Sequence, residues 1–277
     1  YVTPAAISHQ IHALEQDLGV RLFQRLNRAV VLTGSARVLL PGLSEGFAGI
    51  ETAVRRLRAH NNTGTLTVTA SPSFAAKWLV LRLHRFQARC AEIDVRLSAT
   101  DEVEDLSKGD FDLAIRYGSG HYPGLDVEQL FTNEVFPACS PQLLAGGPPP
   151  RTPDDLRHHA LIHDQAVERD PLVPTWPMWL KAAGVKDIAG TGGLSFNNMH
   201  LALDAAIAGH GVVLAYSTIA AADLAAGRLV RLFSLSLPDQ FAYYIVTAPG
   251  ALERPKVRAF RDWLREEADW QPQPAPV

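Results

Sequence analysis

Apolar residues recur at helical spacing in the first part of the chain and predict an amphipathic helix over residues 4–18. Their separations are four, three and four positions, at Ile7, Ile11, Leu14 and Leu18. Residues with this spacing share one face of a helix. Thr3 suits the N-cap, Pro4 suits the first helical position, and Gly19 suits the residue that ends a helix.

The opposite face of this predicted helix carries short or hydrogen-bonding side chains, namely Ala5, Ser8, His9 and His12. Such side chains can approach base edges and phosphates in a DNA major groove. Thr3 and Pro4 lie at the start of the same helix, and Arg25 and Arg28 lie beyond it in a predicted basic wing. The pattern therefore predicts a recognition helix and a wing that bind DNA through these eight residues.

A second periodic segment, residues 34–60, predicts one long helix. Its apolar positions are spaced four, four, three, four and three residues apart, at Leu39, Leu43, Phe47, Ile50, Val54 and Leu57. This spacing is close to that of a coiled-coil seam, and Pro41 predicts a bend. The helix either packs on its own core or pairs with a second copy. A preceding DNA-binding unit favours pairing, because palindromic half-sites need a two-fold symmetric protein. Residues 61–64 then predict a hinge.

From residue 65 onward, strand-like and helix-like segments alternate, which predicts an α/β fold with helices covering a sheet. Strands are predicted at 66–70, 93–99, 111–117, 160–163, 194–196, 212–215 and 241–247, with two short ones inside 126–139. Helices are predicted at 74–87, 177–183, 200–208, 218–226 and 255–268. Residues 271–277 are proline-rich and predict a disordered tail.

The N-terminal residues carry a family resemblance. The order Ser8-x-x-Ile11-x-x-Leu14-Glu15-x-x-Leu18-Gly19-Val20-x-Leu22-Phe23-x-Arg25, followed by Leu32-Thr33, resembles the winged helix-turn-helix of LysR-type transcriptional regulators. The resemblance implies that residues 1–33 are the C-terminal part of that domain, without its first helix and most of its second. It also implies that residues 34–63 are a linker helix and hinge, and that this helix pairs antiparallel with its partner.

The rest of the chain resembles the effector domain of the same regulators, which is similar to type 2 periplasmic binding proteins. The matching pieces begin at Ala70, Asp112, Phe136, Ala205 and Leu224, and they read ASPSFAAKWL, DLAIRYG, FPACSP, AAIAGHGV and LAAGRLV. The resemblance implies two lobes, residues 64–136 plus 241–270 and residues 137–240, with residues 271–277 as a tail. The sequence of these pieces is most similar to that of the subgroup of glycine-cleavage activators and β-lactamase regulators.

Two predicted helix starts follow strands and should face the cleft between such lobes. Free N–H groups at helix starts bind anions, and the first start brings Ser71, Ser73 and Phe74 while the second brings Asn197 and Asn198. Ser71 and Ser73 are either effector contacts or helix caps only.

Two further residues lie at predicted strand ends near the cleft. Period-two alternation puts Arg116 on the face opposite Leu113 and Ile115, at the cleft rim, unless it forms a structural ion pair with Asp112 or with a loop carboxylate. Tyr216 points either into the cleft or into the core. Together with the helix starts, these residues are the predicted effector site.

Charge and composition narrow the function. The net charge of the chain is −3, but residues 1–60 hold seven Lys or Arg and four Asp or Glu, so this part is +3 and the remainder −6. A basic head on an acidic body fits a DNA-binding module joined to another domain. Cys90 and Cys139 are too far apart in the sequence to match the spacing of metal-binding cysteines. We expect them to be small buried residues in a reducing compartment. No transmembrane run or signal peptide is visible, and the helix-turn-helix points to the cytoplasm.

No catalytic or cofactor motif stands out in the sequence. His158, His159, His163 and Asp164 form the richest polar cluster, but their spacing does not favour a converging metal site. No nucleophile elbow, phosphate loop or dinucleotide fingerprint is present. We therefore expect no cofactor, no metal and no enzymatic activity.

The expected function is transcriptional regulation controlled by a small-molecule effector bound between two lobes. The expected partners are a pseudo-palindromic operator, an effector and further copies of the chain in a dimer or tetramer, with RNA polymerase as another candidate. The alternative is a solute-binding protein or an enzyme on the same bilobal scaffold, because fold alone does not fix function. Residues 1–60 discriminate between them, since neither alternative has a use for a DNA-binding head.

Overall fold

The computed structural model describes residues 3–26, 29–59, 64–102, 106, 109–165, 170, 172–186 and 193–269. The chain divides into two compact units, Tyr1–Arg58 and Ala59–Val277. We describe the first as the head and the second as the effector unit.

The head begins with helix α1 (Pro4–Leu18). The Thr3 hydroxyl accepts a hydrogen bond from the Ala6 amide at 3.3 Å, and Gly19 ends the helix in the left-handed region with φ 66°. The strands β1 (Phe23–Leu26) and β2 (Ala29–Leu32) then form an antiparallel hairpin. The predicted N-cap and C-terminal glycine are therefore confirmed, and the chain after α1 has the form of a two-stranded wing.

The long predicted helix is present as α2 (Gly34–Ala59), which continues through Pro41. The Thr33 hydroxyl accepts from the Ala36 amide at 3.3 Å and donates to the Arg21 carbonyl at 2.7 Å. One side chain thus joins the start of α2 to the residues that precede the wing. Apolar side chains of α2 are exposed within the described residues: Val38, Leu40, Leu43, Phe47 and Ile50.

The effector unit is built on a nine-stranded sheet among its described residues. Its strands are β3 (Gly64–Ala70), β4 (Ile93–Ala99), β5 (Leu113–Gly118), β6 (Asp126–Cys139), β7 (Leu161–Asp164), β8 (Gly193–Phe196), β9 (Val212–Tyr216), β10 (Val230–Arg231) and β11 (Leu237–Thr247). The order across the sheet is β4-β3-β5-β11-β6-β9-β7-β8, and β10 pairs with β6. The two longest strands lie at the centre of this order.

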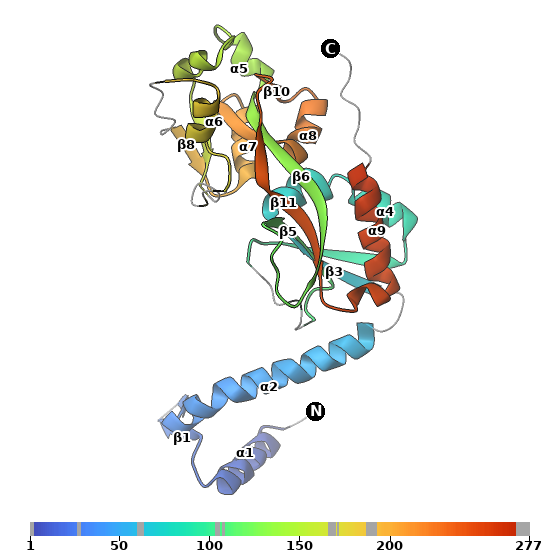
Figure 1. Cartoon of the computed structure of the whole chain (residues 1–277). Helices are drawn as coiled ribbons and strands as arrows, with labels where there is room; N and C mark the ends of the chain where they lie inside the picture. The colour runs from blue at the N-terminus through green and yellow to red at the C-terminus, as the bar shows by residue number, and fades with distance from the viewer. Residues whose placement is uncertain are drawn as a thin grey trace. The chain divides into compact units, whose positions relative to one another are not determined.

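These two strands join two lobes. β6 and β11 are antiparallel and run side by side through both halves of the effector unit (Figure 1). β5 pairs with one end of β11, while β9 pairs with the far end of β6. The predicted pair of short strands within 126–139 is wrong, because this segment is one continuous strand that pairs in both lobes. Lobe I contains β3, β4 and β5, and lobe II contains β7, β8 and β9.

Helices cover the sheet in each lobe, and one predicted helix is broken. The helix predicted over 74–87 is α3 (Pro72–Phe74), the π-helical turn η1 (Ala75–Leu79) and, after a turn at 80–82, α4 (Leu83–Arg89). The break arises because the Val80 amide bonds back five residues to the Ala75 carbonyl. In this arrangement Trp78 stacks on Phe74 with ring centroids 4.9 Å apart, and both are buried.

The other helices agree with the predicted ones to within a residue or two. In lobe II they are α6 (Trp176–Ala182), α7 (Met199–Ile207) and α8 (Ser217–Ala225), and short turns add α5 (Pro141–Ala145) and η3 (Pro153–His158). In lobe I, η4 (Ala251–Glu253) leads into α9 (Pro255–Asp269). Residues 271–277, the predicted tail, lie outside the described residues.

A continuous core of buried apolar side chains extends through both lobes. Phe86, Phe260 and Trp263 pack together with ring centroids 4.9 to 5.3 Å apart and hold α4 against α9. Trp176 and Trp179 of α6 are buried in lobe II, and their indole N–H groups donate to the Ile162 and Leu235 carbonyls. These contacts hold α4 and α9 together in lobe I and hold α6 against the strands of lobe II.

Candidate functional site

The polar face of α1 is accessible, as the predicted DNA contact requires. Thr3, Ser8, His9 and His12 are exposed within the described residues. The predicted apolar face is also largely uncovered there, since Ile7, Leu14 and Leu18 are exposed. Pro4 and Ala5 belong to α1 and Arg25 belongs to β1, but the structure does not describe their side chains. Arg28 lies outside the described residues.

Glu15 connects the recognition helix to the wing. Its carboxylate accepts from the Leu22 amide at 2.7 Å and from the Phe23 amide at 3.1 Å. These two backbone hydrogen bonds hold the pKa of Glu15 below its usual value. The turn between α1 and β1 is thus fixed by a side chain of the helix itself, and sequence reasoning gave Glu15 no such role.

A cavity of about 290 Å³ lies between the two lobes of the effector unit. Its lining comes from strand ends and helix starts of both lobes: Ser71, Ser73, Asp101, Tyr117, Asp164, Val173, Asn197, Asn198, Met199, Tyr216, Ile219, Phe241 and Tyr243. The structure therefore brings together five predicted effector residues, Ser71, Ser73, Asn197, Asn198 and Tyr216. A volume near 300 Å³ is of the size that small-molecule sites occupy.

The two serines of this cavity have different partners. The Ser71 side chain is buried, and its hydroxyl has no hydrogen-bond partner among the described residues. The Ser73 hydroxyl reaches the other lobe, where it accepts from the His200 amide at 3.1 Å and lies 3.4 Å from His200 Nδ1. Ser73 therefore caps α7 across the cleft, whereas Ser71 leaves a polar atom available to a ligand. Burial of such an atom without a partner costs free energy.

Aromatic side chains form one wall of the cavity. Tyr117 packs against Tyr216, Phe241 and Tyr243 with ring centroids 5.9, 5.5 and 5.3 Å away. The Tyr117 hydroxyl donates to Asp239 at 2.7 Å. Burial raises the pKa of Tyr117, Tyr216 and Tyr243 above the usual value of a tyrosine. These hydroxyls therefore stay protonated near neutral pH and are able to donate a hydrogen bond.

Two carboxylates also line the cavity, one from each lobe. Asp101 follows β4 of lobe I, and Asp164 ends β7 of lobe II. Burial raises the pKa of Asp101, while the nearby charges of Arg116 and His200 oppose that rise. Sequence reasoning did not assign these residues, or Tyr117, Phe241 and Tyr243, to the cleft, although each lies in or beside a predicted strand.

Two predicted effector residues do not line this cavity. Phe74 is fully buried in the core and stacks on Trp78. Arg116 is buried as well, and its guanidinium donates to the Thr69 hydroxyl and to the carbonyls of Thr100 and Glu102 at 2.8 to 3.0 Å. Arg116 therefore holds the segment that carries Asp101.

Asp112, which was the predicted ion-pair partner of Arg116, binds two other cationic side chains. Lys256 donates to Asp112 at 3.0 Å, and Arg254 pairs with the same carboxylate. Asp112 thus ties β5 to residues at the start of α9.

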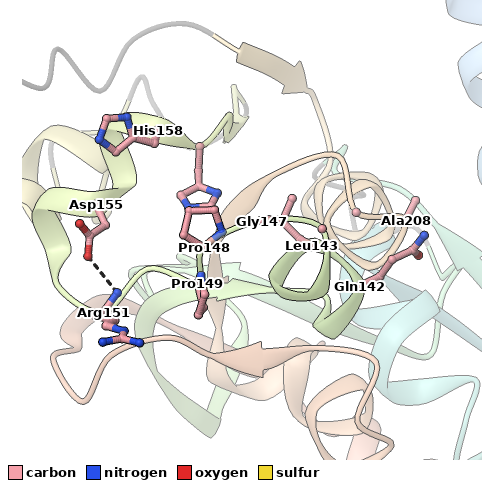
Figure 2. Close-up of a pocket in the computed structure, with 12 residues that line it drawn as sticks. Gln142, Leu143, Gly147, Pro148, Pro149, Arg151, Asp155, His158 and Ala208 are labelled. Atoms are coloured by element: carbon pink, nitrogen blue, oxygen red, sulfur yellow. Dashed lines mark hydrogen bonds between the residues drawn. The ribbon is translucent and has the colours of Figure 1, made fainter.

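A larger cavity, of about 660 Å³, lies in lobe II beside α5 and η3 (Figure 2). The Asp155 carboxylate at its edge accepts from the amides of Arg151 and Thr152 at 2.9 and 2.8 Å and from the Thr152 hydroxyl at 3.0 Å. These hydrogen bonds lower the pKa of Asp155. The Asp155 carboxylate is therefore occupied in capping η3.

Within the described part of the chain, no group of three or more His, Cys, Asp or Glu is arranged to hold a metal ion. No described helix is both long and apolar enough to cross a membrane. Cys90 and Cys139 are free thiols, and burial raises the pKa of Cys139 to about 11.

Known proteins match the whole architecture. Residues 1–37 match the family of bacterial regulatory helix-turn-helix proteins of the lysR family, and residues 59–269 match the LysR substrate binding domain. The glycine cleavage system transcriptional activator of Escherichia coli K12 is 41% identical over 268 residues, which cover 97% of this chain and 86% of that protein. The HTH-type transcriptional activator AmpR of Pseudomonas aeruginosa is 35% identical over 96% of this chain and 87% of its own length.

Solved structures agree with these matches. The effector domain of AmpR from Pseudomonas aeruginosa superimposes with a TM-score of 0.61 at 32% identity, and the match covers 74% of this chain and 96% of that domain. CrgA, a LysR-type regulator from Neisseria meningitidis, gives a TM-score of 0.61 at 20% identity over 96% of this chain and 90% of its own, which shows the shared fold. These relatives are transcriptional regulators rather than enzymes, and they include the predicted subgroup. The chain belongs to the LysR family of DNA-binding transcriptional regulators, with a helix-turn-helix head and a bilobal effector-binding domain.

Proposed function

We propose that this regulator responds to a small polar molecule that binds in the cavity between the lobes, in contact with Ser71, Asn198 and Tyr216. The observation that carries the proposal is the buried Ser71 hydroxyl, which lines the cavity and has no partner among the described residues. The neighbouring hydroxyls and amides supply further donors and acceptors. A ligand that satisfied them would favour one arrangement of the lobes over another, which is how binding shifts a conformational equilibrium.

The DNA-contacting residues of the head are part of the same proposal. Ser8, His9 and His12 lie on the exposed face of α1 and would read base edges. Thr3, Pro4 and Ala5 at the start of α1, and Arg25 and Arg28 in the wing, would complete the contact with a bound operator. The operator would be pseudo-palindromic, with two heads binding successive major grooves. Because the target is DNA, we expect the protein to act in the cytoplasm, and RNA polymerase is an expected partner of an activator of this family.

The assembly is proposed to be a dimer or a dimer of dimers that pairs through α2. In the head taken alone, Phe47 is 67% exposed and Ile50 is 61% exposed. Apolar side chains in a row along one helix are typical of a seam that a second helix covers. The proposed domain division keeps residues 34–63 as the linker between the winged helix-turn-helix part, residues 1–33, and the two lobes.

The effector assignment is tested with the full chain. A thermal-shift screen of small amino acids, carboxylates and peptidoglycan fragments selects a ligand, which is then titrated by calorimetry into wild type, Ser71→Ala and Asn198→Ala. Loss of one hydrogen bond to a polar or charged ligand group costs roughly 1–3 kcal/mol, so we expect affinity to fall about tenfold.

Ser234→Ala is the matched control, because Ser234 is exposed and lies outside the cavity lining. Unchanged affinity in Ser71→Ala and Asn198→Ala would show that the ligand binds elsewhere. Binding lost equally in all three variants would point to a general loss of structure instead.

A further inference from the structure

Two side chains of lobe I cross the cleft and bind helices of lobe II. Lys77 Nζ lies 2.6 Å from Asp204 Oδ1 on α7 and 3.1 Å from Asp223 Oδ2 on α8. One turn earlier in the chain, the Ser73 hydroxyl accepts from the His200 amide at the start of α7. The contact between the lobes at this place is therefore polar and is made by one short segment of lobe I.

Burial differs among the members of this cluster. The side chains of Lys77 and Asp223 are 13% and 3% exposed, whereas that of Asp204 is 59% exposed. Asp223 also accepts from Arg228 Nε at 2.8 Å, within lobe II. Because Asp223 has a partner of its own in lobe II, removal of the Lys77 charge would not leave a buried carboxylate without a cation. Lys77 is thus the member whose loss acts on the contact between the lobes rather than on lobe II.

The backbone of lobe I directs Lys77 toward this contact. Lys77 lies in the π-helical turn η1, where the Val80 amide bonds to the Ala75 carbonyl. π-Helical turns are rare and often occur at functional sites. Lys77 does not line the cavity between the lobes, but Ser73 does. The segment therefore presents one residue to the cavity and another to the facing helices.

We propose that Lys77 is an inter-lobe latch, a positioning residue that binds Asp204 and Asp223. By this contact it holds Ser73 against α7, and it holds together the cavity walls that the two lobes supply. The pair with the exposed Asp204 is modest in strength, and Asp223 keeps Arg228 as a partner when its pair with Lys77 breaks, so the latch opens and closes in solution. The population of the closed state sets the apparent affinity of any molecule that binds between the lobes, since only the competent fraction binds.

The inference adds a residue to the proposed effector response but is tested without an effector. The reporter is the His200 amide and the first turn of α7, followed by hydrogen–deuterium exchange of the full chain in peptides that span 197–205. In Lys77→Met the methylene stem stays and the charge is lost. We expect exchange in these peptides to become roughly three- to tenfold faster, because local opening no longer has to break the ion pairs.

Three comparisons separate the latch from a general structural role. Lys77→Arg keeps the charge and should restore slow exchange, while Lys181→Met removes an exposed lysine from α6 and should change nothing. Combining Asp204→Asn with Lys77→Met should add less than the sum of the two single effects, because both remove the same pair.

Either of two results would overturn the proposal. One is unchanged exchange at 197–205 in Lys77→Met, which would mean that the lobes are held by other contacts. The other is an equal acceleration in peptides of α9 and β3, which would mean that Lys77 stabilises the whole unit and does not position the lobes. Neither result depends on whether an effector has been found, so failure of the effector proposal remains distinguishable.

Discussion

Single side chains join the elements of this protein at points where the backbone changes direction. Glu15 holds the two amides that lead into the wing, and Thr33 caps α2 while bonding to the Arg21 carbonyl. Ser73 does the same between lobes, through the His200 amide. In each case a short polar side chain satisfies a backbone group that would otherwise lose its partner at an element boundary.

The proposed DNA contacts predict different effects for Arg28, a phosphate contact, and Ser8, a base contact. Arg28→Ala should weaken binding to all operators alike and should lower the slope of log affinity against log salt by about one, because one phosphate contact is lost. Ser8→Ala should leave that slope unchanged and relax discrimination among bases. Fluorescence anisotropy with the full-length regulator, at several salt concentrations and on mutated operators, measures both. A change in sequence preference without a change in slope for Arg28→Ala would rule out its role as a phosphate contact.

Local signals in the sequence predicted the residues of the helix ends, but not the composition of the cavity. Thr3 and Gly19 act through neighbours within four residues, so their roles follow from the sequence alone. The cavity is made by segments as distant as Ser71, Asp164 and Phe241. Arg116 is an example. Period-two alternation predicts the face of β5 on which it lies, but not its hydrogen bonds to the carbonyls of Thr100 and Glu102, which come from another segment.

At the scale of elements, the long helix α2 carries the main open surface of the head. Its periodic apolar positions predict a seam, and of those that the structure describes in full, Leu43, Phe47 and Ile50 are exposed within the head while Leu39 is half-buried. The broken helix of residues 72–89 shows the opposite case. There the apolar spacing predicts one helix, but the hydrogen bond from the Val80 amide back to the Ala75 carbonyl interrupts the α-helical pattern. Apolar spacing alone does not indicate such an interruption.

The proposed seam predicts a dependence of assembly on Ile50. Ile50→Glu should place a charge between paired helices, and burying an unpaired charge is costly enough to separate them. Light scattering or sedimentation should then detect smaller species. Ser44→Glu, which adds the same charge to α2 outside the predicted seam, should leave assembly unchanged. An unaltered assembly state in Ile50→Glu would move the main interface to the effector unit.

At the scale of the whole molecule, a buried polar cluster ties the start of α9 to the sheet of lobe I. The Lys256 ammonium is buried, donates to the Thr65 carbonyl at 2.6 Å and to Asp112 at 3.0 Å, and Asp112 in turn accepts from the Thr67 amide. The residues come from β3, from the position before β5 and from the start of α9. Removal of one partner of a buried ion pair leaves an uncompensated charge.

This cluster predicts a large loss of stability in Asp112→Asn. The expected cost is about 3–5 kcal/mol, the usual range for breaking a buried pair from one side. Urea unfolding of the full chain, followed by tryptophan fluorescence, measures the change. Asp94→Asn on the exposed side of β4 is the control and should remain near wild type. A cost below 1 kcal/mol in Asp112→Asn would mean that Lys256 and Arg254 find other partners.

The path of the chain through β6 and β11 also has a consequence for biosynthesis. Lobe II lies between these strands as one continuous stretch, whereas lobe I needs β11 to pair with β5, and the Tyr244 to Arg116 pairing spans more than a hundred residues. Pairings so distant in sequence form slowly. A ribosome therefore delivers everything that lobe II needs before lobe I can be completed, although lobe I begins first. A nascent chain that stops before Arg254 leaves the ribosome with Asp112 lacking both Arg254 and Lys256, so its lobe I has neither of the ion pairs that hold this carboxylate.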